Sequence, residues 1–351
     1  MKRALRLLAA TLVALAVAGA ATYAYLNSKL SRFAATAFGS GVSTVDIAVG
    51  TSPKAVAALL AKHGVVEDAD LLYGYLRRER LGPSLRAGEY EFELPLSPIQ
   101  VIEKLSRGHV KLYRFTIPEG LRVDEILPII AESDLHPPLS TLRKLASDAA
   151  FARKLGVPAP SFEGFLFPDT YSFPRGTTAE QVFEKLVSRA LEEISKAPRA
   201  AGIDLSTLQV ATLASIVEKE TGAPEERPRI ACVFHNRLRQ GIKLQTDPTV
   251  LYAKMLTTGA FSKNITKRDL EAEHPYNTYA VKGLPPGPIA SAGAAAIHAA
   301  LNPLSCNDLF FVSKNDGTHV FCPDLKCHEA NVEKWQRAFF RKRDARPSSP
   351  P

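Results

Sequence analysis

The sequence contains no internal repeat, and its formal net charge of +8 comes without a recognisable RNA- or DNA-binding motif. It has only four cysteines among 351 residues. The cluster of Cys322, Cys327 and His328 lacks the spacing of a standard zinc site. The hydrophobic and charged fractions, 46% and 23%, are ordinary for a folded protein and argue against long disordered segments. We therefore expect a globular protein with room for two domains plus appendages, and no nucleic-acid partner.

Three cysteines lie late in the chain, where an oxidising compartment would permit a disulfide: Cys306, Cys322 and Cys327. The sequence does not decide which of them would pair. Cys232 lies in an apolar stretch of predicted helix, and we expect it to be a buried free thiol.

The main apolar run is Leu7–Leu26, which has 20 uncharged residues. At ~1.5 Å per helical residue it is ~30 Å long, enough to cross the hydrocarbon core of a bilayer. Lys2, Arg3 and Arg6 precede it, so the positive-inside rule places residues 1–6 in the cytoplasm and the body of the protein outside.

A cleaved signal peptide is the alternative, because Ala18-Gly19-Ala20 fits a small-x-small cleavage site. The apolar run continues past that site, and signal sequences usually have shorter apolar cores. We therefore favour a retained transmembrane anchor at residues 7–26. Both interpretations export the rest of the chain.

The pattern after the anchor predicts an α+β protein with a small module and a larger domain. Residues 27–41 are expected to be a linker and residues 42–109 a small α/β module of order strand, helix, helix, strand, helix. The last helix begins at Ser97-Pro98, with Ile99, Ile102 and Leu105 expected to face inward.

Residues 110–342 are expected to form a mixed α+β domain, followed by a basic, proline-rich tail at 343–351. Its predicted strands are 111–117, 310–313 and 319–321, the last two joined by an Asn315-Asp316-Gly317 turn. Its predicted helices are 123–133, 140–154, 178–196, 206–221, 228–240, 248–257, 293–301 and 332–342.

Glu218 is the leading candidate for chemistry, because it follows an apolar run on the helix predicted to begin near Ser206. A carboxyl group held there would be partly desolvated, and its pKa would rise toward the range of a general acid. Helical spacing puts Glu218 above small side chains such as Ala214 and Ser215, which predicts open space over the carboxyl. Glu220 shares the bulkier face and is expected among packed apolar groups, paired with an arginine such as Arg229.

Polar segments downstream of Glu218 have the composition of a sugar-binding groove. Residues 244–249 carry Gln245 and Asp247 in a polar stretch that ends in a turn. Residues 274–289 place Asn277 and Tyr279 before a rigid Pro/Gly-rich loop. Aromatic rings can cover the apolar faces of sugars, and amides can bind their hydroxyls. A purely structural loop is the alternative.

Several long segments resemble the YceG-like family of membrane-bound endolytic murein transglycosylases. They are residues 163–171, 214–221, 233–238, 244–249 and 275–289, together with Ala300-Leu301-Asn302-Pro303. The resemblance spans nearly the whole chain, but it weakens near the end. There the chain keeps the family's Gly317, His319, Phe321 and His328, and has Cys322, Asp324, Cys327 and Glu329 at four positions where the family usually has other residues.

The resemblance implies a single-pass anchor, a LysM-like module and a catalytic transglycosylase domain. It implies that Glu218 is the catalytic glutamate and that Glu163, Glu220, Gln245, Asp247, Asn277 and Tyr279 line the substrate site. The substrate would be peptidoglycan, cut at MurNAc–GlcNAc bonds without water to leave 1,6-anhydro ends, which would end the elongation of nascent strands. The enzyme would need no metal or organic cofactor. It would lie in the bacterial inner membrane with its catalytic domain on the periplasmic side, near penicillin-binding synthases.

Three other activities are weighed against this one. A hydrolase would normally need a second carboxylate, and Asp247 is the obvious candidate for it. A non-catalytic, membrane-anchored peptidoglycan-binding scaffold would use only the module and the anchor. A pyridoxal-phosphate lyase would need a phosphate cup of glycines and hydroxyls, which the sequence does not contain.

Overall fold

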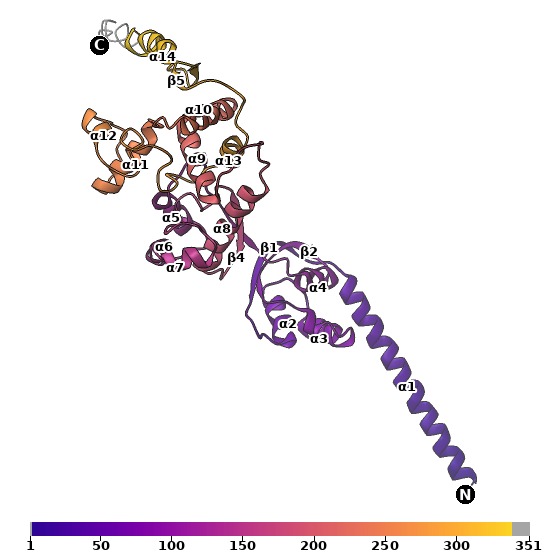
Figure 1. Cartoon of the computed structure of the whole chain (residues 1–351). Helices are drawn as coiled ribbons and strands as arrows, with labels where there is room; N and C mark the ends of the chain where they lie inside the picture. The colour runs from indigo at the N-terminus through magenta and orange to yellow at the C-terminus, as the bar shows by residue number, and fades with distance from the viewer. Residues whose placement is uncertain (1, 339–351) are drawn as a thin grey trace, which may run out of the picture. The chain divides into compact units, whose positions relative to one another are not determined.

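The computed structural model describes residues 2–338, and the chain forms two compact units (Figure 1). The first comprises residues 1–113 and 172–176, and the second comprises 114–171 and 177–351. Helices and three two-stranded sheets make up both units, which confirms the expected α+β class. The expected tail at 343–351 lies outside the described residues.

The first unit begins with α1 (Lys2–Ala35), one helix that is long and apolar enough to cross a membrane (Figure 1). Its apolar side chains are exposed, as at Leu7, Leu12 and Leu15, as expected of a surface made for lipid rather than for water. The structure differs from the expected linker at 27–41, because α1 continues to Ala35 and β1 begins at Phe38. Ala34 is fully buried, so packing against the unit extends the helix past the apolar run.

The rest of this unit has the expected order of strand, helix, helix, strand and helix. It consists of β1 (Phe38–Ile47), α2 (Pro53–Lys62), α3 (Ala69–Arg78), β2 (Gly88–Leu96) and α4 (Pro98–Arg107). The strands β1 and β2 pair antiparallel, and Val45 lies opposite Tyr90. The core beneath them contains Val45, Ile47, Val56, Leu60, Leu72, Leu76, Tyr90, Phe92, Val101, Ile102 and Leu105.

Local capping explains where these helices start. The Ser52 and Asp68 side chains accept hydrogen bonds from backbone N–H groups in the first turns of α2 and α3. Ser97 and Gln100 form a capping box on α4. One expectation for α4 is wrong: Ile99 is 44% exposed, whereas Val101, Ile102 and Leu105 face the core.

The chain passes between the two units within β3 (Leu112–Thr116) and β4 (Thr170–Pro174), which form the second sheet. The strand β4 is not among the strands predicted from the sequence. The predicted helix at 140–154 is interrupted near Ser147 and Asp148. The helices between the two strands are α5 (Val123–Glu132), α6 (Leu139–Ala146) and α7 (Ala149–Lys154).

The centre of the second unit is α9 (Thr207–Glu220), in which every residue from Val210 to Val217 is buried. Its start is fixed by a capping box between Ser206 and Gln209. The helix α13 (Ala294–Leu301) packs on α9 and on α10 (Arg227–Arg239). The remaining helices are α8 (Ala179–Lys196), α11 (Asp247–Thr258) and α12 (Lys267–Glu271).

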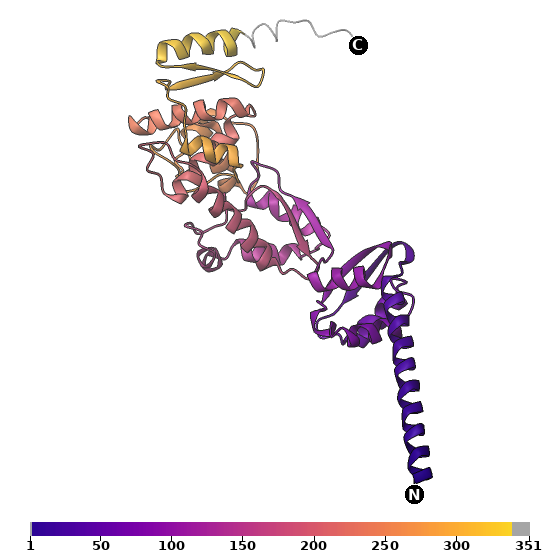
Figure 2. The ribbon, with the colours of Figure 1, turned by 90° about the vertical axis from the view of Figure 1, so that its right-hand side faces the viewer.

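The last described elements are β5 (Phe310–Ser313), β6 (His319–Cys322) and α14 (Leu325–Val332), followed by one turn of π-helix at Glu333–Arg337. The strands pair antiparallel, with Val312 opposite Val320, which confirms the hairpin expected around the Asn-Asp-Gly turn. Figure 2 shows α14 lying beside this hairpin. The helix predicted at 332–342 starts earlier than expected, and residues 339–342 lie outside the described part of the chain.

Candidate active site

Glu218 lies in the last turn of α9, and its side chain is only 6% exposed. Its Oε1 accepts a hydrogen bond from Arg227 Nη2 at 2.8 Å. Its Oε2 accepts one from the backbone N–H of Gly293 at 3.1 Å. Three elements therefore hold this carboxyl: α9, the start of α10, and the residue that precedes α13.

Burial raises the pKa of Glu218, although the Gly293 N–H and the Arg227 charge act in the opposite direction. The neighbouring Glu119 carboxylate raises the pKa further. A larger fraction of Glu218 is therefore protonated at neutral pH than of an exposed glutamate. Such a group can donate a proton and afterwards keep the resulting charge next to a guanidinium.

Glu119 and Arg227 belong to this site, and the sequence did not single them out. Glu119 lies in the turn between β3 and α5, and its Oε2 is 3.5 Å from Arg227 Nη2. The turn is held to residue 291 by two backbone hydrogen bonds of 2.8 Å each. Lys219 Nζ donates to the Gly120 carbonyl at 2.9 Å. In the sequence, the only sign of a special role for Glu119 is its position between Pro118 and Gly120. No local pattern connects that turn to Glu218.

The open space expected over Ala214 and Ser215 is absent in the described structure, and the segment that leads into α13 contacts Ser215. Both residues are fully buried, and Ser215 Oγ accepts a hydrogen bond from Ile289 N at 3.0 Å. Two buried polar atoms nearby, Arg227 Nε and Ser291 Oγ, have no hydrogen-bond partner among the described residues. The polar face of the Glu218 site is thus incompletely satisfied by the protein itself.

Glu220 differs from expectation, because it faces a pocket of about 550 Å³ rather than packed apolar groups. Its carboxyl accepts a hydrogen bond from Thr246 Oγ1, and burial raises its pKa to about 7. It does not pair with Arg229, which forms an ion pair with Asp308 at 2.8 Å. Residues two apart on a helix differ by about 200° in direction, so Glu218 and Glu220 leave α9 on opposite sides.

The pocket brings together four of the residues predicted to bind substrate: Glu220, Gln245, Asp247 and Tyr279. Tyr279 donates its hydroxyl to Asp247 Oδ1 at 2.7 Å, and Arg237 Nη1 donates to Gln245 Oε1 at 3.2 Å. Phe310 and Phe311 also line it, so the pocket combines polar groups with aromatic faces. Glu218 is not among its lining residues.

Asn277 and Glu163 lie outside this pocket. Asn277 is fully buried, and its amide nitrogen donates to the carbonyls of Asp269, Leu270 and Ala272. Glu163 accepts hydrogen bonds from Val123 N at 3.2 Å and from the Tyr252 hydroxyl at 3.3 Å. Burial raises the pKa of Glu163 to about 7. Both side chains are bonded to protein groups.

The segment where the family pattern weakens forms the other wall of the pocket. His319 Nδ1 is 2.6 Å from Glu226 Oε2, and His328 stacks on Phe310. Burial lowers the pKa of His328, and the Arg237 charge lowers it further. Cys322 and Cys327, two of the four departures from the pattern, form a disulfide with each other.

The expectation of a free thiol at Cys232 is wrong. Cys232 forms a disulfide with Cys306, 74 residues later, and this bond ties α10 to the chain that leads into β5. None of the four cysteines, all of which the structure describes, is free. The pairing brings together residues that are remote in sequence, which helical patterning around Cys232 does not predict.

Three comparisons relate the chain to known proteins. The profile of the YceG-like family matches residues 45–334. A Bacillus subtilis (strain 168) protein named endolytic murein transglycosylase is 31% identical over 309 residues, which cover 83% of this chain and 84% of that protein. A protein of the same name from Streptococcus pneumoniae serotype 2 is 28% identical over 82% of this chain, which spans 57% of the relative's length.

A solved structure is also similar. The 2.6 Å crystal structure of a yceG-like protein from Listeria monocytogenes matches with a TM-score of 0.53 and 30% identity, covering 82% of this chain and 98% of that one. At this level of identity the likeness extends to both sequence and fold.

Proposed function

The chain belongs to the YceG-like family, and on this premise we propose that it is an endolytic murein transglycosylase that cuts glycan strands of peptidoglycan internally. The observation that carries the proposal is the Glu218 carboxyl, which is buried, has a raised pKa, and lies between a guanidinium and a backbone N–H. Two relatives named for this activity support it.

In the proposed reaction, protonated Glu218 donates its proton to the glycosidic oxygen between MurNAc and GlcNAc. The bond to that oxygen breaks as positive charge develops at C1 of the muramic sugar. The Glu218 carboxylate then takes the proton of the sugar's own C6 hydroxyl, whose oxygen bonds to C1 and closes a 1,6-anhydro ring. One carboxyl group thus acts first as acid and then as base, and no water is consumed.

Arg227 and Gly293 support the second half of this cycle. Once Glu218 has given up its proton, Arg227 Nη2 and the Gly293 N–H stabilise the carboxylate and fix its orientation. They hold the base in place until it accepts the C6 proton. Glu119 keeps the local charge from becoming strongly positive, because it contacts the same nitrogen of Arg227.

We assign sugar binding to the pocket lined by Glu220, Gln245, Asp247 and Tyr279. The faces of Phe310 and Phe311 suit the apolar faces of pyranose rings, and the polar groups suit their hydroxyls. Asn277 and Glu163, which the resemblance places at the substrate, instead position the segments around them, because protein groups occupy their hydrogen-bonding atoms.

The location of the protein and the role of its first unit follow from the anchor and the small module. We propose that α1 spans the bacterial inner membrane and that both units lie on the periplasmic side. There the first unit would serve as a LysM-like glycan-binding module. Cleavage close to the membrane would end the elongation of nascent strands, with penicillin-binding synthases as neighbours.

The test compares the parent chain with Glu218→Gln, Glu220→Gln and Glu132→Gln on purified sacculi, with products identified by mass spectrometry. The parent should release fragments lighter by one water than hydrolytic ones. Glu218→Gln should lower their release by at least about 10²-fold, the usual contribution of a general acid, without lowering the melting temperature. Glu132→Gln, which changes an exposed acid on α5 outside both the Glu218 site and the pocket, is the control and should keep the activity of the parent, whereas Glu220→Gln tests the sugar-binding pocket.

The outcomes separate the alternatives. Retained activity in Glu218→Gln would remove the assignment of this residue. Hydrolytic products would favour a hydrolase that uses Asp247. A parent chain that binds glycan but never shortens it would instead support the non-catalytic scaffold.

A further inference from the structure

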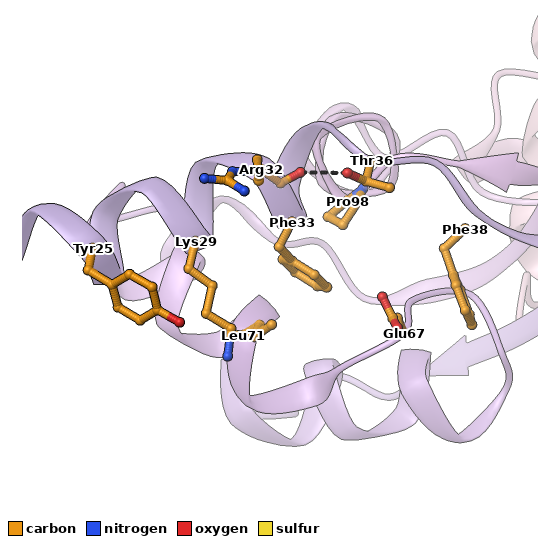
Figure 3. A pocket seen from close by; sticks show the side chains of 9 residues that line it. All are labelled: Tyr25, Lys29, Arg32, Phe33, Thr36, Phe38, Glu67, Leu71 and Pro98. Atoms are coloured by element: carbon orange, nitrogen blue, oxygen red, sulfur yellow. Dashed lines mark hydrogen bonds between the residues drawn. The ribbon is translucent and has the colours of Figure 1, made fainter.

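Besides the pocket beside Glu220 in the second unit, the first unit contains a pocket of about 300 Å³ at the end of α1 (Figure 3). Two basic side chains of α1 line it, Lys29 and Arg32, together with one acid, Glu67. The rings of three aromatic residues also line the pocket: Tyr25, Phe33 and Phe38. Neither the family resemblance nor the proposed reaction uses this pocket.

Both walls of the pocket are fixed to each other. Arg78 on α3 donates from Nη1 to the Asn27 carbonyl at 3.1 Å, to Asn27 Oδ1 at 2.7 Å and to Ser31 Oγ at 3.1 Å. Leu30 packs so closely on Gly74 that an added Cβ there would lie 3.4 Å from its Cδ2. The end of α1 is therefore part of the folded unit, and the pocket exists before any ligand binds.

The pocket lies at the depth of lipid headgroups if Leu7–Leu26 fills the hydrocarbon core. Lys29 and Arg32 then follow the last core residue by ~4.5 Å and ~9 Å along the helix axis, at ~1.5 Å per residue. The headgroup layer on each side of a bilayer is about 5–8 Å thick, so Lys29 lies at the depth of this layer and Arg32 lies at its outer edge. Tyr25 lies at the boundary, where aromatic rings are enriched.

The positive and negative charges in the pocket lie at different distances from the bilayer when α1 spans it. Within residues 2–338, no ion pair involves Lys29, Arg32 or Glu67. The two cations stand on α1 itself, whereas Glu67 lies beside Phe38, at the end of the pocket farther along the chain from the apolar run (Figure 3). Positive charge is thus nearer the bilayer and negative charge is farther out. A phospholipid whose phosphate is capped by an amine has the complementary order.

We infer that this pocket binds the headgroup of a phosphoethanolamine lipid in the leaflet on the side of the folded units. Lys29 and Arg32 take the phosphate, and Glu67 takes the terminal ammonium. A carboxylate favours a primary ammonium, because that group has N–H donors and a quaternary ammonium has none. The inference rests on α1 spanning the membrane, which is part of the proposed function, and it is independent of the reaction.

The test uses the full chain reconstituted in vesicles of equal parts phosphatidylethanolamine, phosphatidylglycerol and phosphatidylcholine. The protein is then extracted in mild detergent, and the lipids retained by it are counted by native mass spectrometry. The parent should retain phosphatidylethanolamine over the other two. Lys29→Gln with Arg32→Gln should lower retention of all three by roughly tenfold or more, given the affinity that each basic residue adds at a phosphate surface.

Glu67→Gln is the decisive variant, because it should keep phospholipid binding but move the preference to phosphatidylglycerol. Lys54→Gln with Lys62→Gln removes two exposed charges on α2, outside the pocket, and should behave as the parent does. Thermal unfolding of each variant checks that the unit is folded.

Equal retention of the three lipids by the parent would overturn the inference, as would an unchanged preference in Glu67→Gln. A chain that does not float with the vesicles would instead contradict the membrane span. Loss of the lipid preference with normal release of anhydro fragments leaves the proposed reaction intact.

Discussion

Glu218 and Glu119 lie close together because both carboxylates contact the same nitrogen of Arg227. Burial raises the pKa of Glu218, and the nearby Glu119 charge raises it further. Glu119 is half-exposed, with 47% of its side chain accessible, whereas Glu218 is buried. The arrangement therefore separates the two acids by environment.

The first prediction concerns the pH dependence of the proposed reaction. Glu119→Gln removes a negative charge that raises the pKa of Glu218, so that pKa should fall. In the proposed reaction, activity requires protonated Glu218 and should be lost as pH rises through the pKa of that group. The alkaline limb of the pH–rate profile should therefore move to lower pH. The measurement is kcat/KM for anhydro-fragment release across the pH range.

Two further variants sharpen this prediction. A Cβ at Gly293 would lie 1.8 Å from Glu119 Oε1, so Gly293→Ala should displace the Glu119 side chain and move the limb in the same direction. Glu132→Gln removes an exposed acid on α5 and should leave the profile unchanged. A profile that is identical in the parent and in Glu119→Gln would count against any influence of Glu119 on Glu218.

At the scale of elements, the parts that the sequence predicted are those fixed by neighbours in the chain. The starts of α4, α8 and α9 follow from their capping residues, and the β5–β6 hairpin follows from its Asn-Asp-Gly turn. The order of elements in the first unit follows from alternating patterns of the same kind.

The parts that the sequence missed are contacts between remote segments. Glu119 meets Arg227 across 108 positions, Cys232 meets Cys306 across 74, and β4 has strand geometry only because β3 pairs with it. For the same reason the apolar pattern of α9 identified a buried helix but not which side faces a pocket. Ile289 contacts Ser215 across 74 positions, and no local signal shows this.

A second prediction concerns Glu163, which connects α5 to α11 through Val123 N and Tyr252. Its pKa is about 7 in the folded protein, against 4.5 for a free glutamate. Between these two pH values the folded state therefore binds more protons than the unfolded state. The contribution of protonated Glu163 to the free energy of unfolding is fully present below about pH 4.5 and is lost as pH rises through about 7. The loss amounts to at most about 3 kcal/mol at 1.36 kcal/mol per pKa unit.

Glu163→Gln keeps a neutral group at this position at every pH. The variant should melt near the parent at pH 5 and above it at pH 8, as measured by thermal unfolding of the full chain. A difference in melting temperature that does not change between these two pH values would show that Glu163 does not titrate in this range.

At the scale of the whole chain, the third prediction is that α1 is retained in the mature protein as a membrane anchor. With 20 uncharged residues in succession, α1 should hold the protein in membranes through high-salt and alkaline carbonate washes. The mass of the purified protein should include residues 1–26. A variant that lacks residues 2–26 should move to the soluble fraction. A mature chain that begins after Ala20 would instead identify a cleaved signal peptide.

If α1 spans the membrane as proposed, the unbroken helix from Lys2 to Ala35, held by Arg78 at its end, makes the first unit follow the inclination of the span. A span longer than the local hydrocarbon thickness relieves the mismatch by tilting. No hinge separates this span from the unit, so a thinner bilayer would rotate the unit through the same angle. Membrane thickness would then set the direction in which β1 and β2 point relative to the bilayer.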